Sequence, residues 1–508
     1  MQRVHLHTVT VATLFMLAGC PPIDNTTTET GTDSESAGGT TTTGDEASES
    51  TPTDTNPPIT TTADTETSGS SSVSESATSS DSTSGDPSTG MVEPECSPDK
   101  QCGAGLFCEA EKCVTCDQTP DGDVACAGED PGTPVCADTA CVECTTDKAS
   151  QCMGNTPVCV DNACSACTQH AECPDSACNL ETGACFGLDY VLYVDRTAPC
   201  DGALGTMEAP FCKIADSFQA MIDGDVTLGW TVKIKPGSYI EVPLVVPDGA
   251  LVSFTRWGDG SVKIRAADDA GDTLTIQNAS KVFLDRLEFK SNADFNGVLC
   301  ASADVFADDV RFTANRLQGY ESTDCNTTIN RSVLFDNDGG GLASYGAGTT
   351  HVVNSYITGN GTQNFGDYGG VRSAQGNELH LVFSSVVNNL SQTGPRSLHC
   401  VDDGAVEVRN SVIIGFAPPS VDCPQAIITT SAVDEGAMDG DTNLMAVNAD
   451  IMNFFDPPAP GTGVYPAKLD SPIKELAVWK TGDSKTDFNG TVRVNMDGGL
   501  DYAGADKP

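Results

Sequence analysis

A short repeat between residues 264 and 414 constrains the fold of this chain more than any other feature. Apolar runs return there at intervals of 23, 23, 23, 23, 30 and 26 residues. The aligned positions are Ile264, Leu287, Val310, Val333, Tyr356, Val386 and Val412. A unit this short cannot bury its own apolar side, so it must stack on its neighbours as one coil of a solenoid.

A second series of positions interleaves with the first. Its members begin at glycine and recur at intervals of 22, 22 and 29 residues: Gly297-Val298-Leu299, Gly319-Tyr320-Glu321, Gly341-Leu342-Ala343 and Gly370-Val371-Arg372. The runs of both series are short and rich in Val, Thr and Gly, which favours strands over helices. Two strands per period predict an all-β protein in which residues 186–425 form a parallel β-helix.

Short sequence motifs before and after the repeat also occur in a characteristic order. Gly205-Thr206 and Pro210-Phe211 precede a Pro-Gly turn within Val232–Tyr239, and the chain closes with the run Asp501–Asp506. This order resembles that of the right-handed parallel β-helix proteins of the pectate-lyase-like superfamily. The resemblance covers roughly residues 190–508, and it implies a right-handed coil with a capping helix near its start.

Both ends of the solenoid are expected to be covered, because unpaired strand edges invite aggregation. A helix over Lys213–Ile222 is expected to cover the first coil, with one face formed by Ile214, Ala215, Phe218 and Ile222. Residues 426–508 are expected to form terminal coils and a covering segment, in which Phe454 and Trp479 pack on the last coil.

Charge and cysteine content limit the partners and the compartment. The 508 residues include 72 acidic and 26 basic side chains, so the net charge is −46. Such a chain repels nucleic acid, which excludes a nucleic-acid partner. The 23 cysteines are too many for a reducing cytosol unless they hold metal. An exported monomer is expected.

Residues 1–20 read as a targeting segment. Arg3 supplies positive charge, and the apolar run Thr8–Ala18 is too short to span a bilayer. Leu17-Ala18-Gly19-Cys20 resembles the lipobox of bacterial lipoproteins. That resemblance implies acyl chains on Cys20, a membrane partner, and a place on the bacterial outer membrane or cell surface. The alternative is an ordinary secretory signal with an unrelated cysteine.

Two regions separate this segment from the solenoid. Residues 21–95 contain no aromatic, Lys, Arg or Cys residue and are rich in Thr, Ser, Asp and Glu, so they are expected to form a disordered tether. Residues 96–185 contain 16 cysteines in a repeated C-x4-C-x2-C unit. CxxC pairs such as Cys141/Cys144 would suit zinc. The export signal and the even count favour disulfides, whose connectivity the spacing does not give.

Six further cysteines are expected to form structural disulfides within the solenoid. The expected pairs are Cys200 with Cys212, Cys300 with Cys325, and Cys400 with Cys423.

Strand alternation assigns the faces of the glycine-led strands. Val298, Tyr320, Leu342 and Val371 are expected inside, which turns Leu299, Glu321, Ala343 and Arg372 outward. In the family that the sequence resembles, this outward strip holds a polysaccharide. Its lyases place calcium-binding carboxylates and a basic proton abstractor there, and its polygalacturonases place three aspartates. The strip of this chain departs from both patterns, which favours binding without catalysis.

The loops beside the strip carry aromatic rings, carboxylates and arginine, as a sugar-binding groove requires. The candidate ligand-binding residues are Tyr345, Phe365, Tyr368, Glu321, Arg372 and Asp338. Were the protein an enzyme, the candidate catalytic residues would be Arg372, Asp402, Asp403 and Asp367. The simplest interpretation of Asp402-Asp403-Gly404 is a turn. His351 and His399 are interpreted as structural or solvated, and Asn354 and Asn410 as parts of a turn ladder.

Two functions from different classes remain. The first is a surface lipoprotein whose β-helix head binds polysaccharide or another surface partner without catalysis. The alternative is a polysaccharide lyase or glycoside hydrolase acting on uronate-containing glycans. Asp439, Asp441 and Asn443 imitate the start of a calcium loop, but Leu444 and Asp450 replace the Gly and Glu that such a loop needs, so no cofactor is expected.

Overall fold

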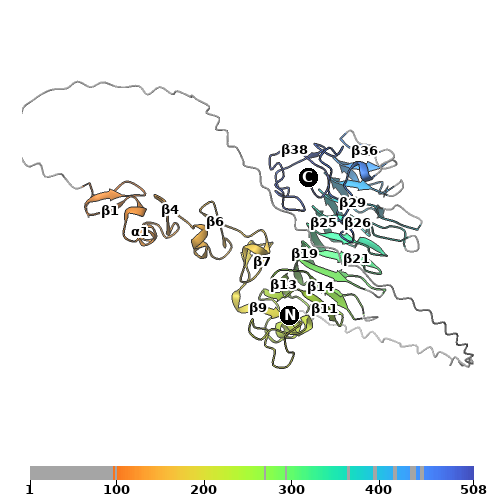
Figure 1. The fold of residues 1–508 in the computed structure, drawn as a ribbon, viewed down its shortest axis with the longest axis horizontal. Coiled ribbons are helices and arrows are strands. Elements are labelled where there is room, and N and C mark those ends of the chain that lie inside the picture. Colours follow the sequence, from red (N-terminus) through yellow and green to blue (C-terminus); the bar gives the residue numbers. More distant parts are fainter. Residues whose placement is uncertain are drawn as a thin grey trace, which may run out of the picture. The chain divides into compact units, whose positions relative to one another are not determined.

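The computed structural model describes residues 95–97, 100–267, 271–291, 294–362, 366–392, 397–415, 420–434, 442–446 and 451–508. From residue 191 onward the chain forms a parallel β-helix, as the repeat predicts, in which three parallel sheets run the length of the stack (Figure 1). Each coil adds one strand to sheet A, then one to sheet B, then one to sheet C.

The strands of the three sheets have the following bounds. Sheet A contains β9 Val191–Val194, β10 Trp230–Ile234, β13 Leu251–Arg256, β16 Lys281–Asp285, β19 Asp304–Asp308, β22 Asn326–Asn330, β25 Thr349–Val353, β28 Glu378–Val382, β31 Val406–Arg409 and β34 Ile427–Thr429. Sheet B contains β11 Gly237–Glu241, β14 Val262–Ala266, β17 Leu287–Lys290, β20 Arg311–Thr313, β23 Val333–Phe335, β26 Tyr356–Thr358, β29 Ser385–Val387, β32 Val412–Ile414, β35 Ala432–Asp434 and β36 Leu444–Ala446. Sheet C contains β12 Leu244–Val245, β15 Leu274–Gln277, β18 Val298–Ala301, β21 Gln318–Thr323, β24 Gly340–Tyr345, β27 Val371–Ala374, β30 Leu398–Val401 and β33 Val421–Asp422.

Sheet C has the register that the glycine-led series predicts. Val298 pairs with Tyr320, Tyr320 with Leu342, and Leu342 with Val371, and all four side chains are fully buried inside the coil. The residues that follow each of them therefore point outward, because side chains alternate along a strand.

Sheet B has a different register from the first series. Its interior row is Ile264, Phe289, Phe312, Leu334, Ile357, Val386, Ile413 and Val433. Three of the aligned positions, Val333, Tyr356 and Val412, face outward instead and belong to a second apolar cluster. Relative to this row, the first series is displaced by one residue at these three positions and by two residues at Leu287 and Val310. The later strands of sheet B are buried on both faces, so apolar and polar residues do not alternate there.

Sheet A adds a third strand to each coil, where the sequence suggested two. Its strands carry many polar residues, as in β22, where Thr327 and Ile329 point inward between partly or fully exposed neighbours. A short strand with so little apolar contrast gives a weak alternation signal.

A ladder of buried asparagines runs along the corner between sheets B and C. Asn315 donates through Nδ2 to Oδ1 of Asn337 (2.7 Å), Asn337 to Asn360 (2.7 Å), and Asn360 to Asn389 (3.0 Å). Each amide also donates to a backbone carbonyl of the preceding coil. The ladder therefore satisfies polar groups that the bend would otherwise leave unpaired.

Helix α2 (Ile214–Asp223) lies at the start of the solenoid and buries Ile214, Phe218 and Met221 against the core. Ile222, which was expected on the buried face, is 56% exposed. Positions i, i+4 and i+7 share one side of a helix, which selects Met221 rather than its neighbour.

Residues 96–185 form four modules, each closed by two interlaced disulfides and carrying a two-stranded antiparallel hairpin. The disulfides are Cys96–Cys108 and Cys102–Cys113; Cys116–Cys136 and Cys126–Cys141; Cys144–Cys159 and Cys152–Cys164; Cys167–Cys178 and Cys173–Cys185. The hairpins are β1 Phe107–Glu109 with β2 Lys112–Val114, β3 Val135–Ala137 with β4 Ala140–Val142, β5 Val158–Val160 with β6 Ala163–Ser165, and β7 Cys178–Asn179 with β8 Ala184–Cys185. Helix α1 (Gly122–Glu129) belongs to the second module.

Each CxxC pair joins two modules instead of serving one site. In the pair Cys141/Cys144, for example, the first residue closes one module and the second opens the next. All these sulfurs are in disulfides, so they offer no thiolate to zinc. Three more disulfides, Cys200–Cys212, Cys300–Cys325 and Cys400–Cys423, lie in the solenoid. So many disulfides are typical of an extracytoplasmic protein.

The fourth module packs on the outer face of sheet A. Phe186 makes an edge contact with Phe283 (5.8 Å between ring centroids), and Phe283 stacks on Phe306 (5.0 Å). Lys233 donates to the carbonyl of Pro174. These contacts cover the apolar part of the outer face of the early coils, so the module and the solenoid share a small apolar core.

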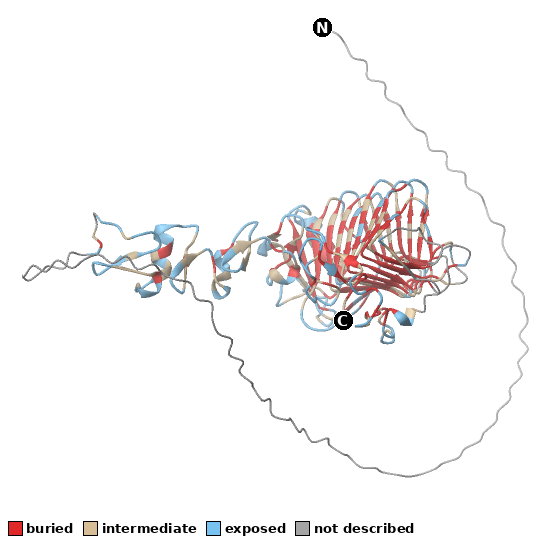
Figure 2. Cartoon of the chain, turned by 90° about the horizontal axis from the view of Figure 1, so that it is seen from above, coloured by how far each residue is buried: buried red, intermediate tan, exposed pale blue. Residues whose placement is uncertain are grey.

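Residues 451–508 form a covering segment along the outer face of sheet B. Phe455, Tyr465, Ile473 and Trp479 pack there against outward side chains such as Tyr356. Several coils take part, whereas the sequence suggested contact with the last coil alone. This segment contains β37 (Ala477–Val478) and β38 (Leu500–Asp501). Figure 2 shows that most of the strands of the solenoid are buried.

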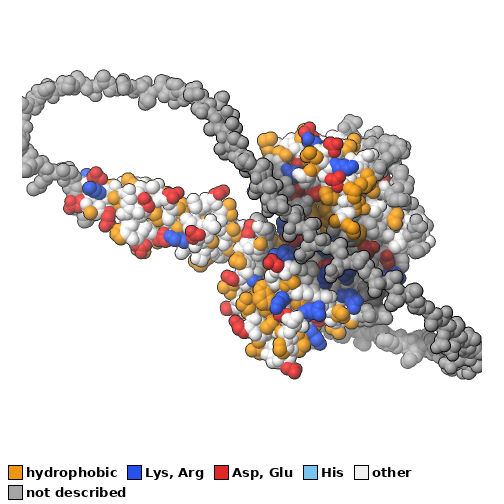
Figure 3. Space-filling view, viewed as in Figure 1, with side chains coloured by type: hydrophobic (Ala, Val, Ile, Leu, Met, Phe, Trp, Pro, Cys, Tyr) orange, Lys and Arg blue, Asp and Glu red, His pale blue; other side chains and the backbone are white. Residues whose placement is uncertain are grey.

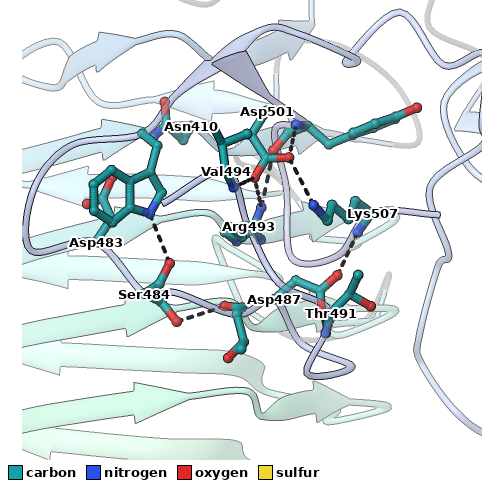
Figure 4. A network of polar contacts seen from close by, with 12 residues as sticks. Asn410, Asp483, Ser484, Asp487, Thr491, Arg493, Val494, Asp501 and Lys507 are labelled. Atoms are coloured by element: carbon teal, nitrogen blue, oxygen red, sulfur yellow. Dashed lines mark hydrogen bonds and ion pairs between the residues drawn. The ribbon is translucent and has the colours of Figure 1, made fainter. Parts of the chain in front are cut away.

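A fully buried arginine fixes this segment to the solenoid. The Arg493 side chain is 0% exposed and donates to Oδ1 of Asn354 (2.9 Å) and to the carbonyls of Gly504 and Ala505 (both 3.1 Å). Figure 4 shows it beside Asp501, with Nη1 and Oδ2 3.7 Å apart. Asn354 and Asn410 thus hold the covering segment and do not form the expected turn ladder, since Asn410 donates to the carbonyl of Val478.

The carboxyl of Asp506 should make stability depend on pH. Burial raises its pKa to about 6 from 3.8. The folded state therefore holds this proton more tightly than the unfolded chain, and the free energy of unfolding falls as pH rises from about 4 to about 6. At about 1.4 kcal/mol per pKa unit, the loss is roughly 2–3 kcal/mol. Urea unfolding of Asp506→Asn at several pH values should lack this component.

The exposed Asp470→Asn variant is the matched control. It should follow the pH profile of the wild type, because an exposed carboxyl is solvated in both states. A profile of Asp506→Asn that parallels the wild type would contradict the assignment.

Among the described residues, no helix is long and apolar enough to cross a membrane. Cys20 and the expected tether at 21–95 lie outside the described residues, except for Glu95.

Candidate functional site

The outward residues of sheet C form one continuous row. In register from β18 to β33 they are Leu299, Glu321, Ala343, Arg372, His399 and Asp422. Neighbouring strands are about 4.8 Å apart, so an extended chain of several sugar units could contact the members of the row on either side of Ala343, which is itself 0% exposed. Charged side chains of both signs are interspersed over the face of the solenoid seen in Figure 3.

Arg372 is the centre of the row. Its guanidinium carbon lies 5.8 Å from the ring centroid of Tyr345 and 5.9 Å from that of Tyr368. Its Nη1 is 3.1 Å from Oδ1 of Asp367. Two rings and one carboxylate therefore hold the guanidinium in place, through cation–π attraction and an ion pair.

The loop after β26 delivers Asp367 and Tyr368 to the row. The Tyr368 ring is 2% exposed and packs directly on the backbone of Gly340, which has a φ of +134°. A Cβ atom at Gly340 would lie 2.6 Å from the ring, so only glycine fits. Gly340, the first residue of β24, thus leaves the space that the Tyr368 ring occupies, and this ring supports Arg372.

Asp367 and His399 extend the polar cluster by one coil. Nδ1 of His399 is 3.7 Å from Oδ2 of Asp367, and its Nε2 is 3.9 Å from Oδ2 of Asp422. Sequence reasoning treated His399 as structural or solvated and did not consider Asp422. The register with Arg372 was the available signal, since one more coil of the same series places His399 next to it.

Glu321 lies two strands before Arg372 and has different neighbours, Asn296 and Asp272. Nδ2 of Asn296 donates to its carboxylate (3.1 Å). Burial raises the pKa of Glu321, and the nearby charge of Asp272 raises it further. Burial likewise raises the pKa of Tyr345, so this phenol is a hydrogen-bond donor at neutral pH. The row can therefore donate and accept hydrogen bonds beside the partly exposed ring of Tyr345.

The remaining candidates lie elsewhere. Asp338 accepts a hydrogen bond from Nη1 of Arg316 (2.9 Å), and Asp402 and Asp403 are exposed in the turn between β30 and β31. The amide of Asn443 bonds to the backbone at Ser431 and Ile428. Phe365, Asp439 and Asp441 lie outside the described residues.

The three sheets and the disulfide modules define the chain as a parallel β-helix protein with a disulfide-rich N-terminal region. A model of a family of unknown function (DUF8331) matches residues 82–191, which include the disulfide modules and less than half of the chain. No curated protein matches the chain.

Among solved structures, two complexes of pectin methylesterase with hexasaccharides are similar to this chain at 13% and 15% identity. They cover 49% and 48% of this chain and 72% and 78% of their own, each with a TM-score of 0.26. A rhamnogalacturonan lyase has 12% identity, coverage of 49% and 75%, and a TM-score of 0.25. Similarity at this level assigns no ligand and no reaction to this chain.

Proposed function

We propose that the solenoid binds a polysaccharide along the outward row of sheet C and performs no chemistry on it. The observation that carries the proposal is the guanidinium of Arg372 held between Tyr345 and Tyr368. The partly exposed Tyr345 ring beside a fixed donor fork can supply the stacking and the hydrogen bonds that sugar recognition requires, while the buried Tyr368 ring supports the guanidinium. Asp367 keeps Arg372 in this position, so the site needs little rearrangement to bind.

The spacing of Glu321 and Asp422, the two carboxylates of the row itself, does not suit hydrolysis. Glu321 and Asp422 are four strands apart in the row, which corresponds to about 19 Å. Glycoside hydrolases hold their two carboxyl groups about 5 to 10 Å apart. The two outward carboxylates of the row therefore cannot act on one glycosidic bond.

Replacement of Arg372 by alanine is expected to weaken binding of an acidic polysaccharide by about tenfold or more, because a charge-assisted hydrogen bond contributes about 1.5–3 kcal/mol. Affinity electrophoresis of the purified protein in gels containing pectin, alginate or a glycosaminoglycan measures the change. Arg265→Ala, on the outward side of β14 in sheet B, is the matched control and should migrate like the wild type.

Incubation of the wild type with the same polymers tests the enzymatic alternative. Release of unsaturated uronate or of new reducing ends, abolished in Arg372→Ala or Asp402→Ala, would replace the proposal by a lyase or hydrolase. Equal retardation of wild type and Arg372→Ala would remove the row from the binding site.

We also propose that acyl chains on Cys20 anchor the head at the bacterial surface. The support is the lipobox-like sequence before Cys20 together with the disulfides, which require an oxidising compartment. Metabolic labelling with palmitate should mark the wild type and leave Cys20→Ser unlabelled. Labelling of both would contradict the anchor.

A further inference from the structure

His170 is buried where the fourth disulfide module meets the outer face of sheet A. It begins the short 3₁₀ helix His170–Glu172, is 3% exposed, and makes an edge contact with Phe283 on β16 (6.1 Å between ring centroids). The backbone N–H of Cys178 donates to Nδ1 of the ring (3.2 Å). Nε2 is also buried and has no hydrogen-bond partner among the described residues. The interface therefore encloses an imidazole that is satisfied on one side only.

The hydrogen bond to Nδ1 requires a neutral ring. Because Nδ1 accepts, the single proton of the neutral imidazole lies on Nε2. In the hairpin of this module Phe186 donates to the carbonyl of Ala177 (2.8 Å), so at the next residue pair the N–H of Cys178 points away from β8 and reaches the ring. A second proton on Nδ1 would set two N–H groups against each other and would bury a positive charge. Protonation therefore destabilises the module in its docked position.

The charged groups beside the ring are already paired with one another or exposed. They line a cavity of about 180 Å³ at the edge of the interface: Asp285, Arg286, Asp308, Asp309 and Arg331. Nε of Arg286 donates to Asp285 (2.8 Å), Nε of Arg331 donates to Asp308 (2.9 Å), and Asp309 is exposed.

On the module itself, the carboxylate of Glu172 accepts from the backbone N–H groups of Thr168 and Gln169 (2.6 and 3.2 Å). No carboxylate that faces His170 is therefore left without a partner of its own, apart from the solvated Asp309. Burial lowers the pKa of His170, and the charges of Asp285 and Asp308 oppose this effect only in part.

We propose that acid undocks the fourth module from sheet A, and that His170 is the group that takes up the proton. The docked ring excludes a second proton, whereas an undocked ring is solvated and binds one. The free energy of docking is therefore fully present above about pH 6.5, the ordinary pKa of histidine, and decreases as the pH falls below it. Undocking exposes Phe283 and the amine of Lys233, which is 7% exposed and donates to the carbonyl of Pro174. The position of the solenoid relative to the cysteine modules then depends on pH.

Two measurements on the full chain test the proposal, each made about one pH unit above and about one pH unit below the ordinary histidine pKa. At the lower pH the proton favours the undocked form by about tenfold. Acetylation of Lys233, measured by mass spectrometry relative to Lys263 in the same sample, should therefore rise about tenfold in the wild type. Lys263 is the internal reference because its side chain is 47% exposed. Hydrogen exchange of the Cys178 amide, corrected for the intrinsic effect of pH, should rise by the same factor.

His170→Asn keeps an acceptor for the N–H of Cys178 but cannot be protonated, so both measurements should give the same result at the two pH values. His351→Gln is the matched control and should respond like the wild type. His351 is an exposed histidine on the outer face of the same sheet, where its ring stacks on that of His380 (4.5 Å between centroids, 14°). Mass spectrometry without reduction shows that each variant retains its disulfides.

Three results would each overturn the proposal. The first is an unchanged ratio of Lys233 to Lys263 acetylation in the wild type, and the second is an equal rise in His170→Asn. The third is faster exchange of the Cys178 amide without faster acetylation of Lys233, because the ring would then titrate in a module that stays docked.

Discussion

Replacement of Arg493 by methionine is expected to lower the free energy of unfolding by about 3–5 kcal/mol, the cost of breaking a buried ionic network by removing one member. The guanidinium donates to Asn354 and to three backbone carbonyls, and it lies 4.0 Å from the centroid of the Phe383 ring. Methionine keeps part of the apolar volume but leaves these acceptors and Asp501 without their donor.

Urea unfolding followed by tryptophan fluorescence measures this effect, because the three tryptophans of the chain, Trp230, Trp257 and Trp479, all lie in the head. Arg265→Met, on the outward side of β14, is the control and should change the stability by less than about 0.5 kcal/mol. An unchanged urea midpoint for Arg493→Met would show that the covering segment adds little to the stability of the solenoid.

Replacement of Asn337 by alanine is expected to cost about 3–4 kcal/mol. Its amide donates to the carbonyl of Phe312 (3.0 Å) and to Asn360 (2.7 Å), and its Oδ1 accepts from the backbone N–H and the side chain of Asn315 (3.1 and 2.7 Å). The residue is 1% exposed, so water does not replace these partners. Each buried group left unpaired costs about 1–3 kcal/mol.

Asn326→Ala is the matched control, since Asn326 donates to Asp304 (2.9 Å) from an exposed position on β22. It should lower the free energy of unfolding by less than about 1 kcal/mol. Equal losses for the two variants in thermal or urea unfolding would mean that the corner ladder is no more important than a surface contact.

The same ladder explains why sequence reasoning found sheet C. A Cβ atom at Gly319 would lie 2.7 Å from Nδ2 of Asn337, and one at Gly341 would lie 3.0 Å from Nδ2 of Asn360. The glycines recur because a Cβ atom there would clash with the asparagines and with the backbone of the next coil, so the period was visible in the glycines alone. The asparagines were missed because they lie in the turns, where Asn is common for other reasons.

In sheet B, the pattern of apolar residues does not predict the register of the strands. Val333 and Leu334 are both buried, one under the covering segment and the other inside the coil. Nothing local distinguishes two adjacent apolar residues that face opposite cores, so the register needs knowledge of a segment more than a hundred residues away.

For the candidate site, sequence alone placed Glu321 and Arg372 on the outward row of sheet C and identified Tyr345 and Tyr368 beside it. It could not find the stacked pair His351 and His380, because their proximity depends on the register of sheet A, the sheet with the weakest alternation. The disulfide connectivity also required coordinates, since spacing alone does not choose among pairings.

The covering segment fixes the number of coils that it spans. Many solenoids lengthen or shorten by whole coils, because each coil contacts only its neighbours. Here one continuous segment is fastened at Tyr356, Asn354 and Asn410, on coils that lie a fixed distance apart. Duplication of a coil between β26 and β32 would pull these fastening points out of reach, whereas duplication before β20 would leave them in place. Growth of this protein by repeat insertion is therefore confined to its N-terminal coils.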